Sequence, residues 1–338
     1  MAVMNCQEPL QPMIKMGHNN RHYKKYDVGM KVKRGYSRIA RPMAATIGNF
    51  DGVHLGHKAM LTQLITQANT RQLPVYVILF EPQPAEYFNR EQAPARLSSL
   101  REKITELKRC GIQNVICLPF NEKLANMDAQ EFVTDILFDR LNVRYLLVGE
   151  DFRYGHKRQG NYPLLFTEAK RFGAEVNCFP DFVESGQRVS STRVRKALME
   201  ADFARAQSLL GHPYRLCGRV MHGAERGRKW GIPTANIALR RVNLVLHGVY
   251  HVLVHRTNNQ CLPAIANIGT RPTVDGSQAY LEVHILDFDS SLYGEILQIE
   301  FLHKLREERK FSSVEALIEQ IRCDIQSCYD FFNIPKIL

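Results

Sequence analysis

The sequence lacks the features that mark a membrane protein or a secreted, disulfide-stapled domain. It has no run of about 18 apolar residues, which a transmembrane helix requires. Its N-terminus has no contiguous apolar core of about 7–15 residues, so we expect no secretory signal. None of its eight cysteines forms a Cys-x-x-Cys pair, and we interpret them as buried or incidental thiols. We therefore expect a cytoplasmic protein that uses neither a membrane nor disulfides.

Positive charge is concentrated near the start of the chain. Of the net charge of +11, seven units lie in residues 1–41, which hold nine basic and two acidic residues. Residues 1–29 also show no hydrophobic period, and we predict a basic, poorly ordered extension there. Such an arm binds RNA or membranes in some proteins, but a solvated tail is the commoner case. We therefore do not expect nucleic acid as a partner.

The length of 338 residues is about twice the common domain size, so we expect two domains. In the first half, buried-strand patterns alternate with helical patterns, which is typical of a doubly wound parallel sheet of the Rossmann-like α/β class. The expected strands are residues 44–47, 75–80, 115–118, 145–148 and 175–179. Ser99 and Asp128 each precede a helical pattern and have Glu three residues later, which predicts a helix N-cap at both.

The pattern changes near Gly211. Short strand candidates then follow one another without helices, at residues 216–221, 249–255, 263–268, 280–286 and 296–302. One helix is expected at 313–331, and its apolar face comprises Val314, Leu317, Ile318, Ile321 and Ile325. Short strands with one closing helix predict a small antiparallel β-barrel. We place the boundary between residues 212 and 213, which gives domains 30–212 and 213–338.

The segment GNFDGVHLGH, residues 48–57, follows a predicted strand and opens a predicted helix. Its glycines let the backbone approach a ligand closely, and helix N-termini favour anions. His54 and His57 are three residues apart, so they share one face of the first helical turn. Two imidazoles there suit a phosphate whose charge rises in a transition state. The alternatives are a plain tight turn, or a zinc site for which no nearby Cys or further His completes the ligand set.

This segment resembles the G-x-F-D-x-x-H-x-G-H signature of nucleotidylyltransferases that move AMP from ATP onto a phosphorylated acceptor. Class I aminoacyl-tRNA synthetases share the His-x-Gly-His core, but their Lys-Met-Ser-Lys-Ser loop is absent here. The segment RVSSTRVR, residues 188–195, instead resembles the Ser-Ser-Thr-x-x-Arg segment of prokaryotic FAD synthetases. Alone, it would indicate only an N-cap and a basic helix.

The resemblance to FAD synthetases implies roles for particular residues. His54 and His57 would be catalytic. The residues that would bind the ATP phosphates are Gly48, Phe50, Gly56, Arg188, Ser191, Thr192 and Arg195. The stretches LFEPQPAEYF from Leu79 and VGEDFRYGHKRQGN from Val148 match the family further. Asp151 would lie near FMN and the adenylate, at a position that is Asn in some members.

The segment GRVMHGAERGRKWGIPTANI, residues 218–237, carries the second candidate site. Gly223, Gly227 and Gly231 would let the backbone approach phosphates. Thr234 and Asn236 offer neutral oxygen ligands for Mg²⁺, a hard cation that also takes phosphate oxygens. Taken alone, the letters PTAN indicate a turn with an Asx cap.

This second segment resembles the G-x-P-T-A-N signature of riboflavin kinases, which form the C-terminal module of bifunctional FAD synthetases. Four further stretches match in the same order: GVYHVLV from Gly248, NIGTRPTV from Asn267, LEVHILDFDSSLYGE from Leu281 and FLHKLREERKF from Phe301. Trp230 stands where the family usually has a smaller aliphatic residue, and we expect packing to accommodate it.

Strand periodicity adds a catalytic candidate to the kinase resemblance. Alternation puts Leu281, Val283 and Ile285 on one face of a strand, so Glu282 lies on the other. A solvated carboxylate is the default for any such residue, whereas the resemblance makes Glu282 the base that takes the proton of the ribityl hydroxyl. The resemblance also suggests that Arg271 and Arg306 lie in loops beside the flavin.

Together the resemblances cover about residues 30–338 and imply a bifunctional enzyme. One domain would phosphorylate riboflavin to FMN, and the other would convert FMN to FAD with release of pyrophosphate, both with ATP and Mg²⁺. An adenylyltransferase of another acceptor, such as a pantetheine phosphate, would leave the barrel motifs unexplained. An RNA-binding protein with a degenerate nucleotide fold would show salt-dependent RNA binding and no ATP turnover.

Overall fold

The computed structural model describes residues 30–223, 227, 230–239, 241, 243–273 and 276–335, and the side chains of 271–278 are not described. The predicted extension, residues 1–29, lies outside this range. The chain divides into two compact units. The described residues of one, the sheet unit, are 30–94 and 103–191, and those of the other, the barrel unit, are 95–102 and 192–335. The domain boundary at 212/213 stays a prediction, because a compact unit reflects packing and not the activity that it carries.

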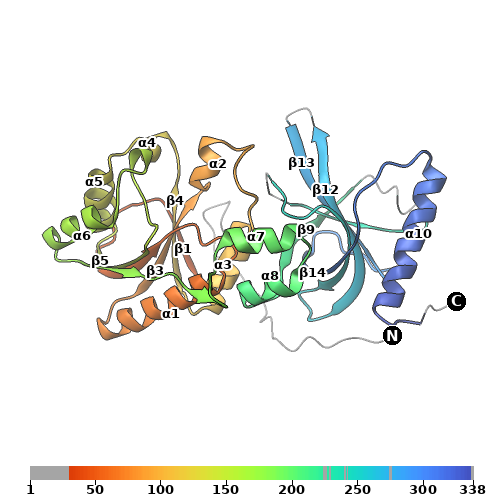
Figure 1. Cartoon of the computed structure of the whole chain (residues 1–338), viewed down its shortest axis with the longest axis horizontal. Helices are drawn as coiled ribbons and strands as arrows, with labels where there is room; N and C mark the ends of the chain where they lie inside the picture. The colour runs from red at the N-terminus through yellow and green to blue at the C-terminus, as the bar shows by residue number, and fades with distance from the viewer. Residues whose placement is uncertain are drawn as a thin grey trace. The chain divides into compact units, whose positions relative to one another are not determined.

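A six-stranded, fully parallel sheet forms the sheet unit (Figure 1), as the alternating pattern predicts. Its strands lie in the order β1-β4-β3-β2-β5-β6. Their bounds are β1 Lys31–Arg34, β2 Met43–Ile47, β3 Val75–Glu81, β4 Asn114–Pro119, β5 Val143–Gly149 and β6 Glu175–Phe179. From β2 the chain adds β3 and β4 on one side, whereas β5 and β6 lie on the other. The topological switch point of the sheet is therefore between β2 and β5.

Helices cover both faces of this sheet. On one face, helix α1 (Leu55–Thr70) packs Leu64 and Ala68 against Tyr145 and Leu147 of β5. On the opposite face, Leu146 and Val148 of the same strand pack against a cluster that includes residues of two other helical segments. Alternate residues of β5 are thus buried on both sides, which explains why the strand is recognisable as a continuous apolar run.

The remaining helical segments of the sheet unit are short. They are α2 Pro84–Phe88, α4 Glu122–Ala125, α5 Ala129–Glu131, the π-helix η2 Phe132–Arg140, the 3₁₀ turn η3 His156–Arg158 and α6 Tyr162–Arg171. The N-cap at Asp128 is confirmed, since its carboxylate accepts from the amides of Gln130 and Glu131. The predicted helix follows it, and from Phe132 onward this helix takes the wider π form of η2. A two-stranded hairpin follows, of β7 Val183–Glu184 and β8 Gln187–Arg188.

Six antiparallel strands close into a barrel in the barrel unit, as predicted. They are β9 Arg215–Met221, β10 Ala235–Ile237, β11 Gly248–His255, β12 Cys261–Thr273, β13 Gly276–Ile285 and β14 Ile296–Arg306, in the closed order β10-β13-β12-β11-β14-β9. The sequence pattern missed the short β10. The N-cap and capping box predicted at Ser99 are confirmed before helix α3 (Leu100–Arg109), which spans the unit boundary. Helices α7 (Ser191–Met199) and α8 (Phe203–Leu210) precede the barrel.

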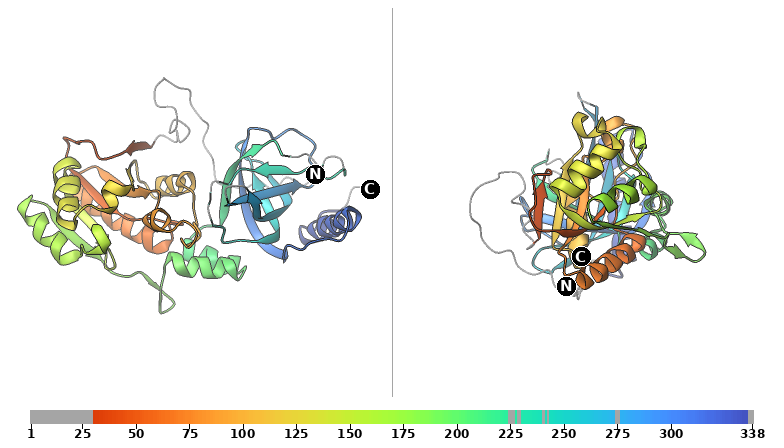
Figure 2. Two further views of the ribbon diagram at one scale, coloured as in Figure 1. Left: turned by 90° about the horizontal axis from the view of Figure 1, so that it is seen from above. Right: turned by 90° about the vertical axis from the view of Figure 1, so that its left-hand side faces the viewer.

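The closing helix α10 (Val314–Phe331) lies against the outside of the barrel in Figure 1 and in the left view of Figure 2. Its Cys328 and Tyr329 are buried together with Val249 and Ile265 of the barrel. The predicted apolar face is wrong at its first position, because Val314 is exposed.

A buried ion pair fixes α10 to the last strand. Asp324, with 5% of its side chain exposed, is held by Arg306 of β14 through contacts of 2.6–3.0 Å. Sequence periodicity did not anticipate a buried carboxylate on this helix. Its burial depends on a partner that lies on another element.

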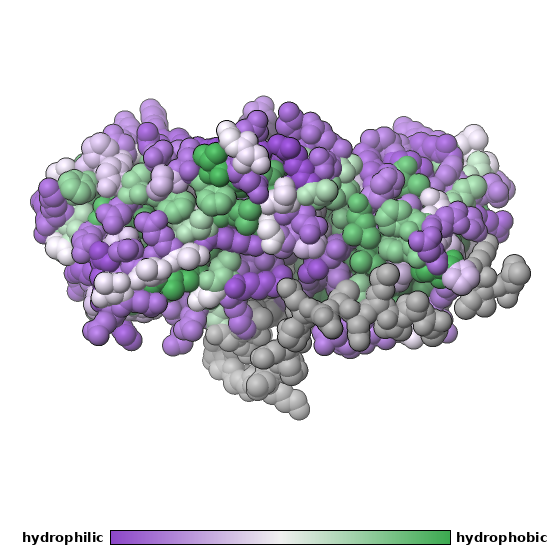
Figure 3. Space-filling model, turned by 60° about the horizontal axis from the view of Figure 1, so that its bottom comes forward, coloured by the Kyte–Doolittle hydropathy of each residue, from purple (hydrophilic) through white to green (hydrophobic). Residues whose placement is uncertain are grey.

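The surface mixes polar and apolar residues. Purple and green residues are interspersed over the face drawn in Figure 3. Within the described part of the chain, no helix combines the length and the apolar character needed to cross a membrane. All seven cysteines in this part are free thiols, and Cys117, Cys261 and Cys328 are buried.

The Arg306–Asp324 pair predicts a stability effect confined to the barrel. We expect Asp324→Asn to lower the free energy of unfolding of the barrel by about 3–5 kcal/mol, because it leaves the largely buried Arg306 without its counter-ion. Fluorescence of Trp230, the only tryptophan in the sequence, reports this unfolding in urea. The control is Glu307→Gln, whose carboxylate pairs with Lys304 but is 74% exposed, and whose effect should stay below about 1 kcal/mol. Equal effects of the two variants would contradict the assignment.

Candidate functional site

The first candidate site lies at the switch point of the parallel sheet. The loop 48–54 leaves the carboxyl end of β2, where ligands bind in open α/β sheets. Three of its residues have left-handed backbone, Phe50 (φ 46°), Gly52 (φ 80°) and Val53 (φ 44°). Such a conformation is costly for Phe and Val, and it persists only where surrounding structure enforces it. Both side chains are buried, which holds the loop in this shape.

The two histidines come together as predicted, but their roles in the helix differ. His54 is the N-cap of α1, and its Nδ1 accepts a hydrogen bond from the His57 amide at 3.4 Å. The two rings are stacked, with centroids 3.7 Å apart and planes 16° apart. A side chain at Gly56 would meet the His54 ring at 3.3 Å, so glycine makes room for this stack. The pair therefore sits at the positive end of the α1 dipole.

His57 is held as a neutral imidazole. Burial, followed by the charges of His54 and Lys103, lowers the pKa of His57 well below its ordinary value of 6.5. Its Nδ1 is buried and has no hydrogen-bond partner among the described residues. A neutral imidazole still has one N–H donor, so it can donate a hydrogen bond to a phosphate oxygen without adding a positive charge.

The structure joins part of the second motif to the first. The Ser191 hydroxyl donates to the Asp51 carbonyl at 2.9 Å, within the same unit as the histidines. Arg188, at the end of β8, forms ion pairs with Asp151 at 2.7 Å and Asp181 at 3.0 Å. Two of the predicted residues, Arg188 and Asp151, are thus direct partners.

The other two residues of the second motif belong to the barrel unit. Thr192 and Arg195 are counted with that unit, where Arg195 Nε donates to the Ala95 carbonyl at 2.7 Å. Their predicted contacts with ATP stay a prediction.

A pocket of about 380 Å³ lies in the barrel unit, and a pocket of about 260 Å³ lies in the sheet unit, beside the ends of β3, β4 and β5. The smaller one belongs to the sheet unit, and its lining includes the aromatic rings of Phe80, Phe88 and Phe120. Its rim carries three cations, Arg153, Lys157 and Arg158. Phe88 is 67% exposed, and its ring packs edge-on against Phe120 at 5.7 Å. Sequence reasoning missed this pocket, although two of the matching stretches, from Leu79 and from Val148, contain most of its wall.

The second candidate site lies on the barrel and is built by strand register. Asn236 of β10 and Asn267 of β12 both pair directly with Glu282 of β13. Residues directly opposite on antiparallel strands share a face, so these three side chains form a row. The predicted alternation is confirmed, since Leu281, Val283 and Ile285 are buried and Glu282 is half-buried. Glu282 therefore faces away from the barrel core.

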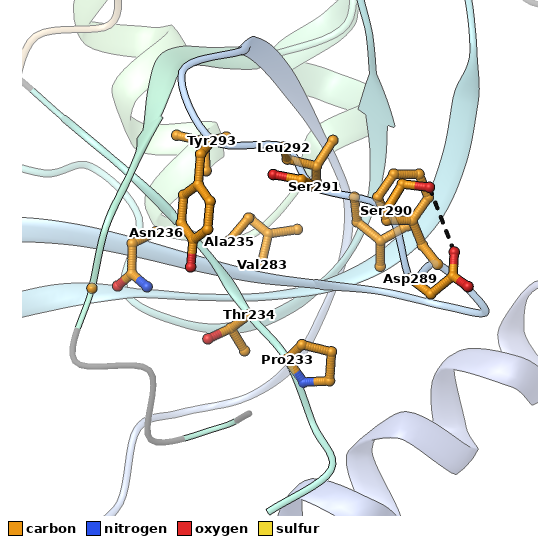
Figure 4. A pocket seen from close by; sticks show the side chains of 14 residues that line it. Pro233, Thr234, Ala235, Asn236, Val283, Asp289, Ser290, Ser291, Leu292 and Tyr293 are labelled. Carbon is orange, nitrogen blue, oxygen red and sulfur yellow. Dashed lines mark hydrogen bonds between the residues drawn. The ribbon is translucent and has the colours of Figure 1, made fainter. Parts of the chain in front are cut away.

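The larger pocket reaches one end of this row, at Asn236, and from β13 it is lined by Val283 and Ile285 (Figure 4). Thr234 and Asn236 line it from β10 and the residues before β10, and the loop Asp289–Tyr293 lines it from the opposite direction. The Tyr293 ring stacks on His222 at 3.8 Å with planes 19° apart. Sequence reasoning did not single out Tyr293, although it lies in the matching stretch that begins at Leu281.

The predicted glycines adopt conformations that restrict substitution. A Cβ at Gly227 would overlap the Ile232 carbonyl, and Gly231 has φ 74°. A Cβ at Gly223 would overlap the amide of Asn236. The backbone of this segment thus runs close to the residues that line the larger pocket.

The oxygen donors beside this pocket suit a cation that arrives with its substrate. Among the described residues, no group of three or more His, Cys, Asp or Glu side chains could hold a metal ion. His54 and His57 therefore belong to no such group. Thr234 and Asn236 supply neutral oxygens next to the pocket. Mg²⁺ bound mainly through nucleotide phosphates needs few protein ligands of this kind, so the residues fit it.

The two arginines predicted to lie beside the flavin are only partly described. Arg271 pairs through its backbone with Gln278, and its side chain is outside the described part. Arg306 is engaged in the ion pair with Asp324 of α10. A flavin contact stays a prediction for both.

Comparisons with known proteins find a match for each half of the chain. A family model described as FAD synthetase matches residues 37–193, and one described as riboflavin kinase matches residues 210–332. The bifunctional riboflavin kinase/FMN adenylyltransferase of Escherichia coli (strain K12) is 45% identical over 311 residues, which cover 91% of this chain and 99% of that protein. The protein of the same description from Haemophilus influenzae is 44% identical over 307 residues, which cover 90% and 100%.

A solved structure shares the fold over most of the chain. It is described as a macrolide-efflux protein from Streptococcus pneumoniae, has a TM-score of 0.69 and 28% sequence identity, and covers 88% of this chain and 99% of its own.

The lowered pKa of His57 predicts a pH dependence of stability. The unfolded chain protonates this imidazole near pH 6.5, whereas the folded chain does so only at much lower pH. The unfolded state thus binds more protons below about pH 6.5, and the free energy of unfolding falls as the pH falls through that window. Urea unfolding of wild type and His57→Gln at pH 7.5 and 5.5, followed by circular dichroism, measures this. The variant should lose less stability than wild type between the two pH values, and an equal loss would contradict a neutral, buried His57.

Proposed function

The chain belongs to the family of bifunctional riboflavin kinase/FMN adenylyltransferases, and we propose that its two candidate sites carry the two reactions of this enzyme. The site on the barrel transfers the γ-phosphate of ATP to riboflavin, and the site on the parallel sheet transfers AMP from ATP to FMN. The domains that serve these reactions are residues 213–338 and 30–212. One observation carries the proposal. The FAD synthetase match contains the whole loop before α1, and the riboflavin kinase match contains the whole row of Asn236, Glu282 and Asn267.

In the kinase reaction, Glu282 is the general base. It accepts the proton of the ribityl 5′-hydroxyl as that oxygen bonds to the γ-phosphorus of ATP, and the bond from the γ-phosphorus to the bridging oxygen of ADP breaks. General base catalysis contributes about 10²–10⁴-fold to a rate, and positioning with Mg²⁺ contributes much of the rest. Mg²⁺ enters with ATP, and Thr234 and Asn236 offer it neutral oxygens. Gly223, Gly227 and Gly231 let the backbone approach the phosphates.

The 380 Å³ pocket, which Asn236 lines next to Glu282 in the strand register, suits the nucleotide. Aromatic rings bind flat heterocycles by stacking, and the stacked pair of His222 and Tyr293 presents such a surface beside Asn236. The adenine ring would lie there, with its phosphates directed toward Thr234. This arrangement leaves the opposite side of Glu282 for riboflavin.

In the adenylyl-transfer reaction, a phosphate oxygen of FMN attacks the α-phosphorus of ATP and pyrophosphate leaves. His54 and His57 lie at the N-terminus of α1, where backbone amides and the helix dipole favour the developing negative charge. The loop with Gly48, Phe50 and Gly56 brings the backbone to the phosphates. Of the second motif, Arg188, Ser191, Thr192 and Arg195 bind the triphosphate, for which guanidinium groups give planar, bidentate contacts.

The 260 Å³ aromatic pocket suits the isoalloxazine ring of FMN. Its walls are aromatic and flat, and its rim carries Arg153, Lys157 and Arg158, which can offset the charge of the FMN phosphate. It opens where β3, β4 and β5 end, near Asp151. The flavin phosphate would thus point toward the histidines across the switch point.

The partners implied are small molecules: ATP with Mg²⁺, riboflavin and FMN. We place the enzyme in the cytoplasm, because free and partly buried thiols are typical of a reducing compartment. An adenylyltransferase of a different acceptor is disfavoured by the riboflavin kinase match over residues 210–332. An RNA-binding function rests only on the basic extension and has no support in either candidate site.

The histidine assignment predicts a selective loss of one activity. His57→Ala should slow conversion of FMN to FAD by about 10²–10³-fold, because one preorganised donor to the transition state is lost. Riboflavin phosphorylation should continue at the wild-type rate and serves as an internal check on folding. His247→Ala, at an exposed position of the barrel unit, is the matched control. Both rates are measured by chromatographic separation of the flavins, and FAD formation at the wild-type rate would overturn the assignment.

The base assignment predicts the opposite selectivity. Glu282→Gln keeps the shape of the side chain but cannot accept the proton, so FMN formation should fall by about 10²–10⁴-fold. Supplied with FMN, the variant should still make FAD at the wild-type rate.

The exposed Glu315 provides the control, and Glu315→Gln should change neither rate. If Glu282→Gln phosphorylates riboflavin normally, Glu282 is a solvated carboxylate. If it loses both activities while its circular dichroism is unchanged, the two sites are not independent.

A further inference from the structure

We propose that Asn267 binds riboflavin directly, by accepting a hydrogen bond from a secondary hydroxyl of the ribityl chain and so holding the neighbouring 5′-hydroxyl at Glu282. This inference rests on the proposed kinase function of the barrel. Asn267 is a substrate-positioning residue in this proposal, and it takes no proton.

Strand register places Asn267 next to the base. It pairs with Glu282 across β12 and β13, on the side of Glu282 opposite to Asn236. Asn236 lines the nucleotide pocket, and Asn267 does not. Glu282 therefore stands between a residue that faces the phosphate donor and a residue on the acceptor side. The acceptor of the phosphate is the flavin alcohol.

The hydrogen bonds of Asn267 fix which way its amide points. The Tyr280 hydroxyl donates its only proton to a carboxylate oxygen of Glu308. The Tyr280 oxygen can therefore only accept from Asn267, and the Asn267 Nδ2 donates to it at 3.5 Å. The amide oxygen Oδ1 is thereby turned away from Tyr280.

The Asn267 side-chain oxygen is unpaired among the residues that the structure describes. Oδ1 is buried and accepts no hydrogen bond from any described residue. Buried carbonyl oxygens are nearly always paired, and an unpaired one is an unusual feature that calls for an explanation. An oxygen acceptor requires a donor, and the ribityl chain supplies hydroxyl donors beside the one that reacts.

The surroundings of Asn267 keep the amide in place. Val249, its other cross-strand neighbour, is buried under α10. The Glu308 carboxylate lies over Gly269, within 2.3 Å of where a Cβ would be. The hydrogen bonds Glu308–Tyr280–Asn267 thus orient the unpaired acceptor of Asn267 before substrate binds.

The test combines Asn267→Leu with substrates that lack single hydroxyls. Leu has about the size of Asn and removes the acceptor. We expect kcat/KM for riboflavin to fall about tenfold, with KM for ATP unchanged, since a neutral hydrogen bond is of this magnitude. Riboflavin analogues with a 2′-, 3′- or 4′-deoxy ribityl chain are then compared. With one of these analogues, the kcat/KM of wild type should fall by about the factor by which Asn267→Leu lowers it with riboflavin. The kcat/KM of the variant should not fall further with that analogue.

The control for this test is a second asparagine of the barrel unit. Asn258→Leu, in the exposed turn between β11 and β12, should behave as wild type with every substrate. If Asn267→Leu and each deoxy analogue reduce kcat/KM additively, Asn267 does not bind a ribityl hydroxyl. If the loss disappears at raised Mg²⁺, or lies in KM for ATP, Asn267 serves the nucleotide or its cation instead, and the proposal is overturned.

A second variant keeps the proposal testable if Asn267→Leu does not fold. Tyr280→Phe keeps the ring but removes the oxygen that orients the amide, so kcat/KM for riboflavin should fall a few fold, with the same dependence on the deoxy analogue. Unchanged kinetics of Tyr280→Phe would overturn the orienting role. Wild type that makes no FMN would refute the proposed kinase function itself, which separates that failure from a failure of this inference.

Discussion

Backbone pairing in the closed barrel is the constraint on which the kinase site depends. Once β10, β13 and β12 are hydrogen-bonded in their register, Asn236, Glu282 and Asn267 have to share one face in a row. A slip of one residue would turn Glu282 into the apolar interior and expose Val283 or Leu281. The same burial that stabilises the barrel therefore fixes the position of Glu282, the base that we propose.

In the sheet unit, the order of the strands fixes where the candidate site residues lie. Parallel strands that diverge from β2 leave a switch point between β2 and β5, and the loops that follow these two strands carry the histidines and Asp151. Burial lowers the pKa of His57, so that the phosphate site we propose would offer N–H donors and a helix N-terminus without an added positive charge. Charge is supplied by Arg188, which Asp151 and Asp181 hold in place.

The sequence predicted those features whose cause is local. Strands β2 to β5 are apolar because helices cover both of their faces, and the alternation along β13 identified the outward-facing Glu282. Strand β1 was missed because Lys31–Arg34 is largely polar and pairs only with β4 at the edge of the sheet. The three residues of β10 are too few to show a period.

Features that depend on partners far along the chain could not be predicted. Asp324 is buried on α10 because Arg306 reaches it from β14, and Val314 is exposed although it fits the helical period. The neutrality of His57 depends mainly on desolvation by surrounding residues and also on Lys103, neither of which its motif contains. Asn267 was part of a matching stretch, but only the tertiary contact with Tyr280 gives its amide an orientation.

The central claim is that one chain transfers two different phosphorus atoms of ATP, the γ at the barrel and the α at the sheet. Its most direct test is to incubate the wild-type chain with riboflavin, Mg²⁺ and ATP that carries a radioactive label at either the α- or the γ-phosphorus, and then to separate FMN from FAD. The account predicts that FMN carries only the γ label and that FAD carries both. Label from the α-phosphorus in FMN, or FAD that carries the α label without the γ label, would contradict it.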